Sequence, residues 1–378
     1  SKYFGNDTIV WSKITSYKTS FRKNESYIYF DDASPALVYN YNGDELYYLG
    51  LLNSVVIEFI LSILNPTLNM QTKDIKYLPI IYLSEYTLLV NRIVQENITL
   101  SKTDWDSFET SWDFEKHPLL NGEKTIEKAF EKWSAECDSR FQKLKANEEE
   151  LNRIFIDIYG LQDELSPEVE DKDVTVRRAD LQREIKSLIS YAVGCFFGRY
   201  SVDSDGLCYA GGEWDAGKYK TIIPDKDNVI PICDDNYFED DLTALVINFV
   251  RKVYGEDTLE ENLKFIADAL ACKGSTPREV IRNYLLTGFY ADHCKIYQKR
   301  PIYWLFSSGK KNGFKALVYM HRWEKTTVAT VRTDYVHELQ ERYETQLSVL
   351  DNEIESAQPA ERAKLKNVRR SSMHSLQR

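Results

Sequence analysis

The order of apolar and polar positions predicts a mixed α/β arrangement in the first quarter of the chain. Three strands are predicted, in SYIYFDD (26–32), PALVYNYNGDELYYLG (35–50) and KDIKYLPII (73–81). A turn is expected at Asn42–Gly43, because Asn-Gly favours the backbone angles of a tight hairpin. Two helices are predicted there: LLNSVVIEFILSIL (51–64), which Asn53 or Ser54 can cap, and SEYTLLVNRIVQEN (84–97).

Two long runs with apolar residues at steps of three and four predict coiled-coil-like helices. The first run comprises Ile126, Phe130, Trp133, Cys137, Phe141 and Leu144, and it resumes at Leu151, Phe155 and Ile158. The second run comprises Val336, Leu339, Tyr343, Leu347, Leu350 and Ile354, and Pro359 is expected to end its helix before a last one at 360–372. Either the two long helices pair antiparallel, or each packs separately on a core.

Shorter helices and one hairpin complete the prediction. Helices are expected near 238–254, 258–271 and 276–290, and the last of them begins with Thr276 as N-cap and Pro277 at its first position. Strands at 301–306 and 314–321 form a β-hairpin (301–321). The predicted fold class is therefore α+β and mainly helical. Its predicted domains are a small mixed α/β module (1–98), a helical spacer (99–200), and a helical domain with the hairpin and the terminal long helices (201–378).

The composition limits which classes of protein this chain can belong to. A chain of 378 residues is long enough for two or three domains, and 43% hydrophobic residues indicate a folded protein. The six cysteines show no CxxC spacing, which predicts reduced thiols, a cytoplasmic location and no metal site. No apolar run approaches the roughly 18 residues of a membrane span. The net charge of −11 argues against nonspecific coating of nucleic acid but not against specific binding.

No complete active site is visible in the sequence. The chain contains no phosphate-binding GxxxxGK[ST] loop, no GxGxxG turn, no GxSxG elbow and no HExxH motif. Pro224–Asp225 would suit a metal-dependent nuclease, but the only suitable Glu-x-Lys (Glu184 to Lys186) precedes it in the chain. The acidic runs at 234–235 and 239–241 could bind a hard cation, but we favour the start of a helix, where carboxylates complement the helix dipole. No catalytic residue is therefore predicted.

Basic and amide residues gather in two places among aromatic residues. The first cluster comprises Lys13, Lys18, Arg22 and Lys23, with Asn40 and Asn42 as amides that can read adenine edges. The second cluster comprises Lys310, Lys311, Asn312, Lys315 and Arg322. Residues 299–325 contain seven basic residues and one acid, in a chain that is acidic overall. Lysines on turns favour phosphate contacts, so both clusters are candidate DNA-binding sites, and ordinary solvated surface is the alternative.

Several segments resemble DNA-modification enzymes. The segment YYLGLLNSVVIEFILSILNPTLNMQTKDIKYLPI (47–80) resembles the end of a target recognition domain in type I specificity subunits and type IIG restriction-methyltransferases. The segment SKTDWDSFETSWDFEKHPLL (101–120) resembles the stretch that comes directly after this domain in the fused enzymes. Three later segments resemble the C-terminal region of the PglX family, the adenine-specific DNA methyltransferases of BREX phage defence: YAGGEWDAGKYKTIIPDKDNVIPICDDNYFEDD, STPREVIRNYLL and KRPIYWLFSSGKKNGFKALVYMHRW. The resemblance extends over essentially the whole chain.

This resemblance implies a C-terminal fragment of a larger enzyme. Family members carry an S-adenosylmethionine loop and an Asn-Pro-Pro-Tyr motif on their N-terminal side, whereas this chain has no Pro-Pro dipeptide, and Asn65–Pro66–Thr67 matches the recognition-domain turn. The chain is therefore expected to hold no cofactor and to be inactive alone, with S-adenosylmethionine bound by the parent enzyme. Its expected partner is double-stranded DNA, held while another domain methylates an adenine.

Two other functions stay open from the sequence. The acidic stretch at 200–265 and the long helices suit a protein-interaction platform that docks other phage-defence subunits. An independent nuclease is the third interpretation, and it would require metal-dependent cutting by this chain.

Overall fold

The computed structural model describes residues 5–38, 44–309, 313–356, 358, 362, 365–367 and 369. These residues divide into two compact units: unit 1 comprises Ser1–Trp105 and Glu136–Arg178, and unit 2 comprises Asp106–Ala135 and Ala179–Arg378. Each unit is thus assembled from two separated stretches of chain. The division into 1–98, 99–200 and 201–378 has different boundaries and stays a prediction.

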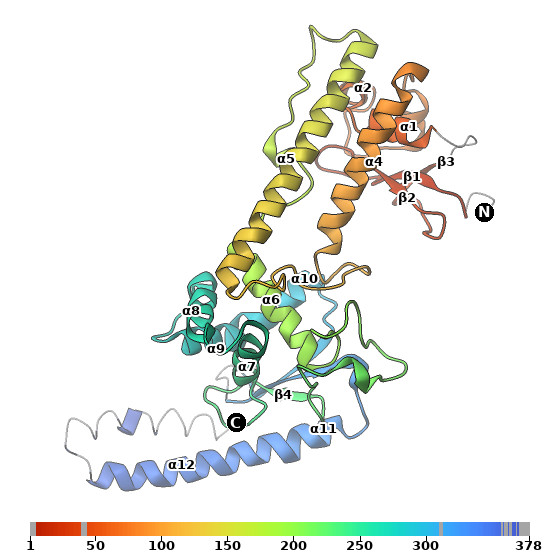
Figure 1. Ribbon diagram of the computed structural model, residues 1–378. Helices are drawn as coiled ribbons and strands as arrows, with labels where there is room; N and C mark the ends of the chain where they lie inside the picture. The colour runs from red at the N-terminus through yellow and green to blue at the C-terminus, as the bar shows by residue number, and fades with distance from the viewer. Residues whose placement is uncertain are drawn as a thin grey trace. The chain divides into compact units, whose positions relative to one another are not determined.

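Unit 1 contains a small sheet and several helices (Figure 1). The antiparallel sheet has the strand order β2-β1-β3, with Trp11 opposite Phe21 and Thr8 opposite Val38. In chain order the elements are β1 (Thr8–Trp11), β2 (Phe21–Asn24), β3 (Ala36–Val38), α1 (Glu45–Leu52), α2 (Val55–Leu64), α3 (Thr72–Lys76), α4 (Ser84–Asp106), α5 (Ile126–Tyr159, in unit 1 from Glu136) and the short turn η1 (Asp171–Asp173).

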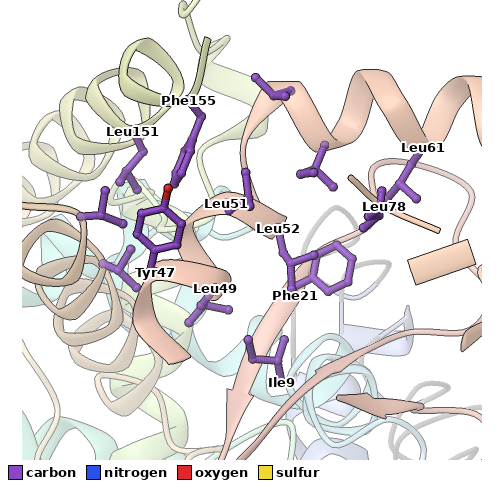
Figure 2. Close-up of a cluster of buried hydrophobic side chains, with 14 of the residues drawn as sticks. Ile9, Phe21, Tyr47, Leu49, Leu51, Leu52, Leu61, Leu78, Leu151 and Phe155 are labelled. Atoms are coloured by element: carbon purple, nitrogen blue, oxygen red, sulfur yellow. The ribbon is translucent and has the colours of Figure 1, made fainter. Parts of the chain in front are cut away.

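The core of unit 1 joins the sheet to α1, α2 and α5. Figure 2 shows Ile9 and Phe21 from the sheet beside the apolar residues of α1, with Leu151 and Phe155 of α5 above Tyr47. Tyr47 and Phe155 are both fully buried and meet edge to face, with ring centroids 5.5 Å apart. Because apolar burial is the main favourable term in folding, this cluster holds the discontinuous unit together.

Helix α1 corrects the prediction of a strand over 35–50. Only Ala36–Val38 is a strand, the Asn42–Gly43 turn lies outside the described residues, and the chain is helical from Glu45. Apolar residues lie on both faces of this helix. They therefore do not show the 3.6-residue spacing by which an amphipathic helix is identified in a sequence. Gly50 is required for close packing, since a Cβ there would meet Val94 Cγ2 at 2.8 Å.

Three further predictions in this region are wrong in detail. Residues 26–32 form turns rather than a strand, and KDIKYLPII begins as helix α3, in which the Asp74 carboxylate accepts the backbone N–H of Gln71. The helix expected over 51–64 is two helices, because Asn53 interrupts it. The Asn53 side chain accepts the Phe21 N–H and donates to the Phe21 carbonyl, both at 2.9 Å, so it completes the free edge of β2. Ser54 is the residue at the N-cap of α2.

The first long apolar run is confirmed as one continuous helix, α5. In unit 1, Phe141 and Leu144 of this run form a small core with Val174 and Val176. Asn147 of α5 also donates hydrogen bonds to Glu96 and Asn97 of α4, at 2.9 and 2.8 Å. These contacts explain the seam of apolar residues within unit 1, while the coiled-coil pairing of the two long helices stays a prediction.

Unit 2 combines helices with a second antiparallel sheet of order β4-β6-β5 (Figure 1). The predicted hairpin is confirmed as β5 and β6, with Trp304 opposite Val318. In chain order the elements are α6 (Leu181–Phe196), η2 (Ala216–Lys218), β4 (Val229–Pro231), α7 (Leu242–Tyr254), α8 (Leu259–Leu270), α9 (Pro277–Thr287), α10 (Phe289–Ile296), β5 (Tyr303–Ser307), β6 (Lys315–Tyr319), η3 (Met320–Arg322), α11 (Thr327–Thr330), the π-helix η4 (Val331–Val336) and α12 (His337–Ser356).

Helix starts in unit 2 follow the capping residues expected from the sequence. Thr276 accepts the Glu279 N–H and Pro277 is the first helical residue of α9, as predicted. Asp241, from the acidic run 239–241, caps α7 by accepting the N–H groups of Thr243 and Ala244. The second apolar run also forms a helix, and its Leu339 and Tyr343 pack in the core beneath the hairpin.

The predicted class, α+β and mainly helical, is confirmed by this architecture. Within the described residues, no individual helix has the length and apolar content of a membrane span; only α1 and α2 counted together, across a 64° bend, reach them.

Candidate nucleic-acid interface

The first basic cluster lies on the β1–β2 edge of unit 1. Arg22 is on β2 opposite Val10, on the sheet face away from Ile9 and Trp11, because successive strand residues alternate faces. Arg22 is exposed, and among the described residues it makes no ion pair. Two strongly exposed tyrosines, Tyr27 and Tyr29, follow in the loop after β2. This edge therefore presents a cation and apolar rings together.

The three lysines of this cluster are paired with acids of unit 1. Lys13 contacts Asp32 at 2.5 Å, and Lys23 contacts Asp7 at 3.6 Å. Asp32 is 92% exposed, so this pair is a solvated one, of a kind worth about 0–1 kcal/mol. A phosphate can therefore replace Asp32 beside Lys13 at little cost. Asn40 and Asn42 lie outside the described residues.

Lys18 is exposed on unit 1, but acids are bound to its ammonium group. Its ammonium is 3.1 Å from Glu58 and 2.8 Å from Asp173. Burial lowers the Lys18 pKa, but hydrogen bonds to Asp173 and Glu58 outweigh it and raise the pKa overall. Burial also raises the pKa of Glu148 to about 7, and the charge of Asp173 adds to that shift while Lys18 opposes it. The positive charge of Lys18 thus offsets the negative charges of these neighbouring acids.

Replacing Glu148 by glutamine is expected to remove a pH-dependent loss of stability in unit 1. The pKa of Glu148 rises from 4.5 to about 7 on folding, so the folded state favours the neutral form. Stability is then fully present below pH 4.5 and falls by roughly 3 kcal/mol as pH rises to 7. Glu148→Gln should flatten this part of the pH–stability curve, measured by urea unfolding.

The matched control for Glu148 is Glu136→Gln, an exposed glutamate on the same helix α5 within unit 1. It should leave the pH dependence unchanged. Equal curves for Glu148→Gln and the wild type would refute the assignment of a raised pKa to Glu148.

The described residues of the second basic cluster make hydrogen bonds within unit 2. Lys315 of β6 donates to the Leu286 carbonyl at 2.6 Å, and burial lowers its pKa. Arg322 donates to the carbonyls of Phe197 and Asp225, at 3.4 and 2.8 Å, and its guanidinium lies 4.9 Å from the Trp214 ring. Lys310, Lys311 and Asn312 lie outside the described residues. Both described residues of this cluster therefore link elements of the unit.

Three carboxylates of unit 2, drawn from around Pro224–Asp225 and from the acidic run 239–241, form a cluster that the sequence does not predict. Ligand oxygens of Asp225, Asp227 and Asp240 lie within 4.8 Å of one another, and the Tyr335 hydroxyl is 2.9 Å from Asp227 and 2.7 Å from Asp240. Burial, followed by the nearby charge of Asp227, raises the pKa of Asp225 to about 7. Such oxygens can hold a hard cation or share a proton. Sequence spacing does not predict this cluster, because Asp240 is distant in the chain.

Two exposed tryptophans, one on β5 and one directly after η3, are not among the predicted site residues. Trp304 is 46% exposed and Trp323 is 40% exposed, and both belong to the aromatic-rich segment KRPIYWLFSSGKKNGFKALVYMHRW. The two-residue spacing of Trp304 and Phe306 on a strand was the available signal, since it puts both rings on one face.

Two curated proteins are similar to the chain along nearly its full length. Adenine-specific methyltransferase PglX of Lacticaseibacillus casei (strain Zhang) is 47% identical over 366 residues, which cover 94% of this chain and 30% of that protein. Adenine-specific methyltransferase BrxX of Escherichia coli O9:H4 (strain HS) is 36% identical over 393 residues, which cover 95% of this chain and 32% of that protein. No family model matches the chain. The chain thus spans about a third of the length of these relatives.

The described sheets do not have the architecture of a glycine-rich nucleotide-binding site. Both described sheets are antiparallel, whereas a glycine-rich nucleotide-binding loop follows a strand of a parallel sheet. The sequence also has no GxGxxG turn and no Pro-Pro dipeptide. No step of methyl transfer is therefore assigned to these residues.

Proposed function

Because the chain belongs to the PglX family of adenine-specific methyltransferases, of which it spans about a third, we propose that it is the DNA-recognition portion of such an enzyme. It binds the duplex in the cytoplasm while a different portion of the parent enzyme transfers a methyl group from S-adenosylmethionine to adenine. This activity marks host DNA and serves phage defence. The similarity to two adenine-specific methyltransferases over more than nine-tenths of the chain is the observation that carries the proposal.

Unit 1 supplies the contacts in this proposal. Arg22 is exposed on the outward sheet face, and Lys13 in the loop after β1 pairs with the solvated Asp32, which a phosphate can replace. Lys23 lies on the other sheet face, opposite Ile9. Phosphate contacts of this kind fix the register of a duplex but do not read its sequence. A fixed register is what an enzyme needs before a target base leaves the stack.

Replacing Arg22 by alanine is expected to weaken duplex binding and its dependence on salt. Each phosphate contact contributes about 0.9 to the slope of log affinity against log salt. Arg22→Ala should therefore reduce the slope by about one, uniformly across DNA sequences. The measurement is fluorescence anisotropy of a labelled duplex over a series of salt concentrations.

Arg92→Ala is the control for Arg22, because it removes the same charge from exposed helix α4 in unit 1. Its slope should match that of the wild type. If Arg22→Ala and Arg92→Ala give the same slope, Arg22 does not contact a phosphate.

A protein-docking platform is the second candidate function, and one acidic stretch of unit 2 favours it. Residues 203–241 contain eleven acids and three lysines. An acidic surface disfavours DNA and suits a basic partner such as another phage-defence subunit. Co-purification of such a subunit with this chain, together with no binding of duplex at low salt, would support docking over DNA recognition.

A further inference from the structure

Three aromatic side chains of unit 2 form a row, which we name the aromatic shelf: Trp304 and Phe306 on β5, and Trp323 directly after η3. Trp304 and Trp323 are exposed, and Phe306 is half-buried. The Trp304 and Trp323 rings meet edge to face with centroids 4.9 Å apart. The Phe306 and Trp323 rings are nearly parallel, at 14°, with centroids 6.3 Å apart. Exposed apolar rings that gather in one patch, unlike rings exposed singly, make the shelf a candidate interaction surface.

The shelf has a rigid support. Trp304 and Phe306 face the same side of edge strand β5, opposite Val318 and Ala316, which are both fully buried. Phe306 also packs against the core that contains Tyr335 and Leu339. Beside it lies an apolar hollow of about 260 Å³, whose lining includes Phe306, Phe314 and Leu339. The rings are therefore held in place before a ligand arrives, which lowers the entropy cost of binding.

The cations close to the shelf residues in the sequence indicate the kind of ligand. Lys299 and Arg300 precede β5, and Lys325 follows Trp323; all three are exposed, and they make no ion pair with any described residue. Glu324 is the one acid between 299 and 325 in the sequence. Lys325 is two residues after Trp323, and Arg300 is four residues before Trp304. Flat rings with cations so close in the chain match a flat base on a phosphate backbone.

We propose that the aromatic shelf stacks an unpaired nucleobase of a nucleic-acid strand, with the neighbouring cations at its phosphates. This inference rests on the proposed function only in taking nucleic acid as the ligand, and it concerns a different surface from the Arg22 edge of unit 1. Stacking on aromatic rings tolerates any base, so the shelf contributes affinity for unpaired strand rather than sequence preference.

The test is anisotropy of a labelled oligothymidine of about 12 nucleotides, which forms no duplex with itself. Trp304→Ala and Trp323→Ala should each raise the dissociation constant about tenfold, since one stacked base is lost. Trp304→Phe keeps a ring and should restore most of the binding. Trp112→Ala, which removes a fully exposed tryptophan of the same unit, should leave the constant unchanged.

Two results would overturn the proposal. One is equal binding by Trp304→Ala, Trp323→Ala and Trp112→Ala; the other is no binding of oligothymidine by the wild type at low salt, as expected if the shelf docks a protein. Should Trp323→Ala unfold, the Trp304→Ala and Trp304→Phe pair decides alone. Arg22→Ala should not change oligothymidine binding to the shelf, so failure of duplex recognition in unit 1 is distinguishable from failure of the shelf.

Discussion

Replacing Arg282 by alanine is expected to lower the free energy of unfolding of unit 2 by about 3–5 kcal/mol, because it leaves a buried carboxylate without its counter-charge. Asp241 is completely buried, and both of its oxygens accept from the Arg282 guanidinium at 3.0 Å. Arg282 also donates to the carbonyls of Cys233 and Asp235. This one side chain of α9 therefore holds the start of α7 and the loop after β4.

A matched control for Arg282 lies on the same helix. Arg278 pairs with Glu260, but the two side chains are 45% and 68% exposed, so Arg278→Ala should cost at most about 1 kcal/mol. Hydrogen exchange of unit 2 peptides, measured with urea unfolding, distinguishes the two variants. Comparable stability of Arg282→Ala and Arg278→Ala would contradict a structural role for the Arg282–Asp241 pair.

Replacing Phe155 by alanine is expected to destabilise unit 1 by about 3–5 kcal/mol, the usual cost of truncating a fully buried phenylalanine. Phe155 is on α5 and meets Tyr47 of α1 in the core (Figure 2). The two residues come from the two separated stretches that form unit 1. Protection from hydrogen exchange should therefore fall in β1, β2 and α1, far from residue 155 in the sequence.

Phe59→Ala provides the comparison for Phe155, since Phe59 is a 36% exposed phenylalanine of α2 in the same unit. Its effect should be below that of Phe155→Ala by several-fold. If Phe155→Ala instead left the exchange of α1 and the sheet unchanged, α5 would not belong to the folded core of unit 1.

The sequence correctly predicted the elements whose determinants are adjacent residues. The α9 start was predicted because Thr276 and Pro277 are capping residues, and α5 was predicted because its apolar residues recur at helical spacing. It failed at α1, where apolar residues on every side hide the helical period. It also did not foresee the return of α5 to the sheet at the start of the chain, because contacts such as Tyr47 with Phe155 leave no local signature.

For the candidate site, too, the sequence predicted local features but not contacts between distant residues. The sequence located the basic residues, and Arg22 is exposed as a DNA contact requires. It did not indicate that Lys18 lies between Glu58 and Asp173, or that Arg322 donates to backbone carbonyls, because those partners are far away in the chain. Counting charges along a segment therefore overestimates how many cations are free to meet a phosphate.

The most direct test of DNA recognition is selection of duplexes by this chain from a pool of random sequence, at low and moderate salt, followed by sequencing of the retained fraction. The account predicts enrichment of one short, asymmetric site that contains an adenine, with affinity that falls steeply as salt rises. Retention of no duplex even at low salt, or retention without any enriched sequence, would contradict the claim that this chain recognises the target.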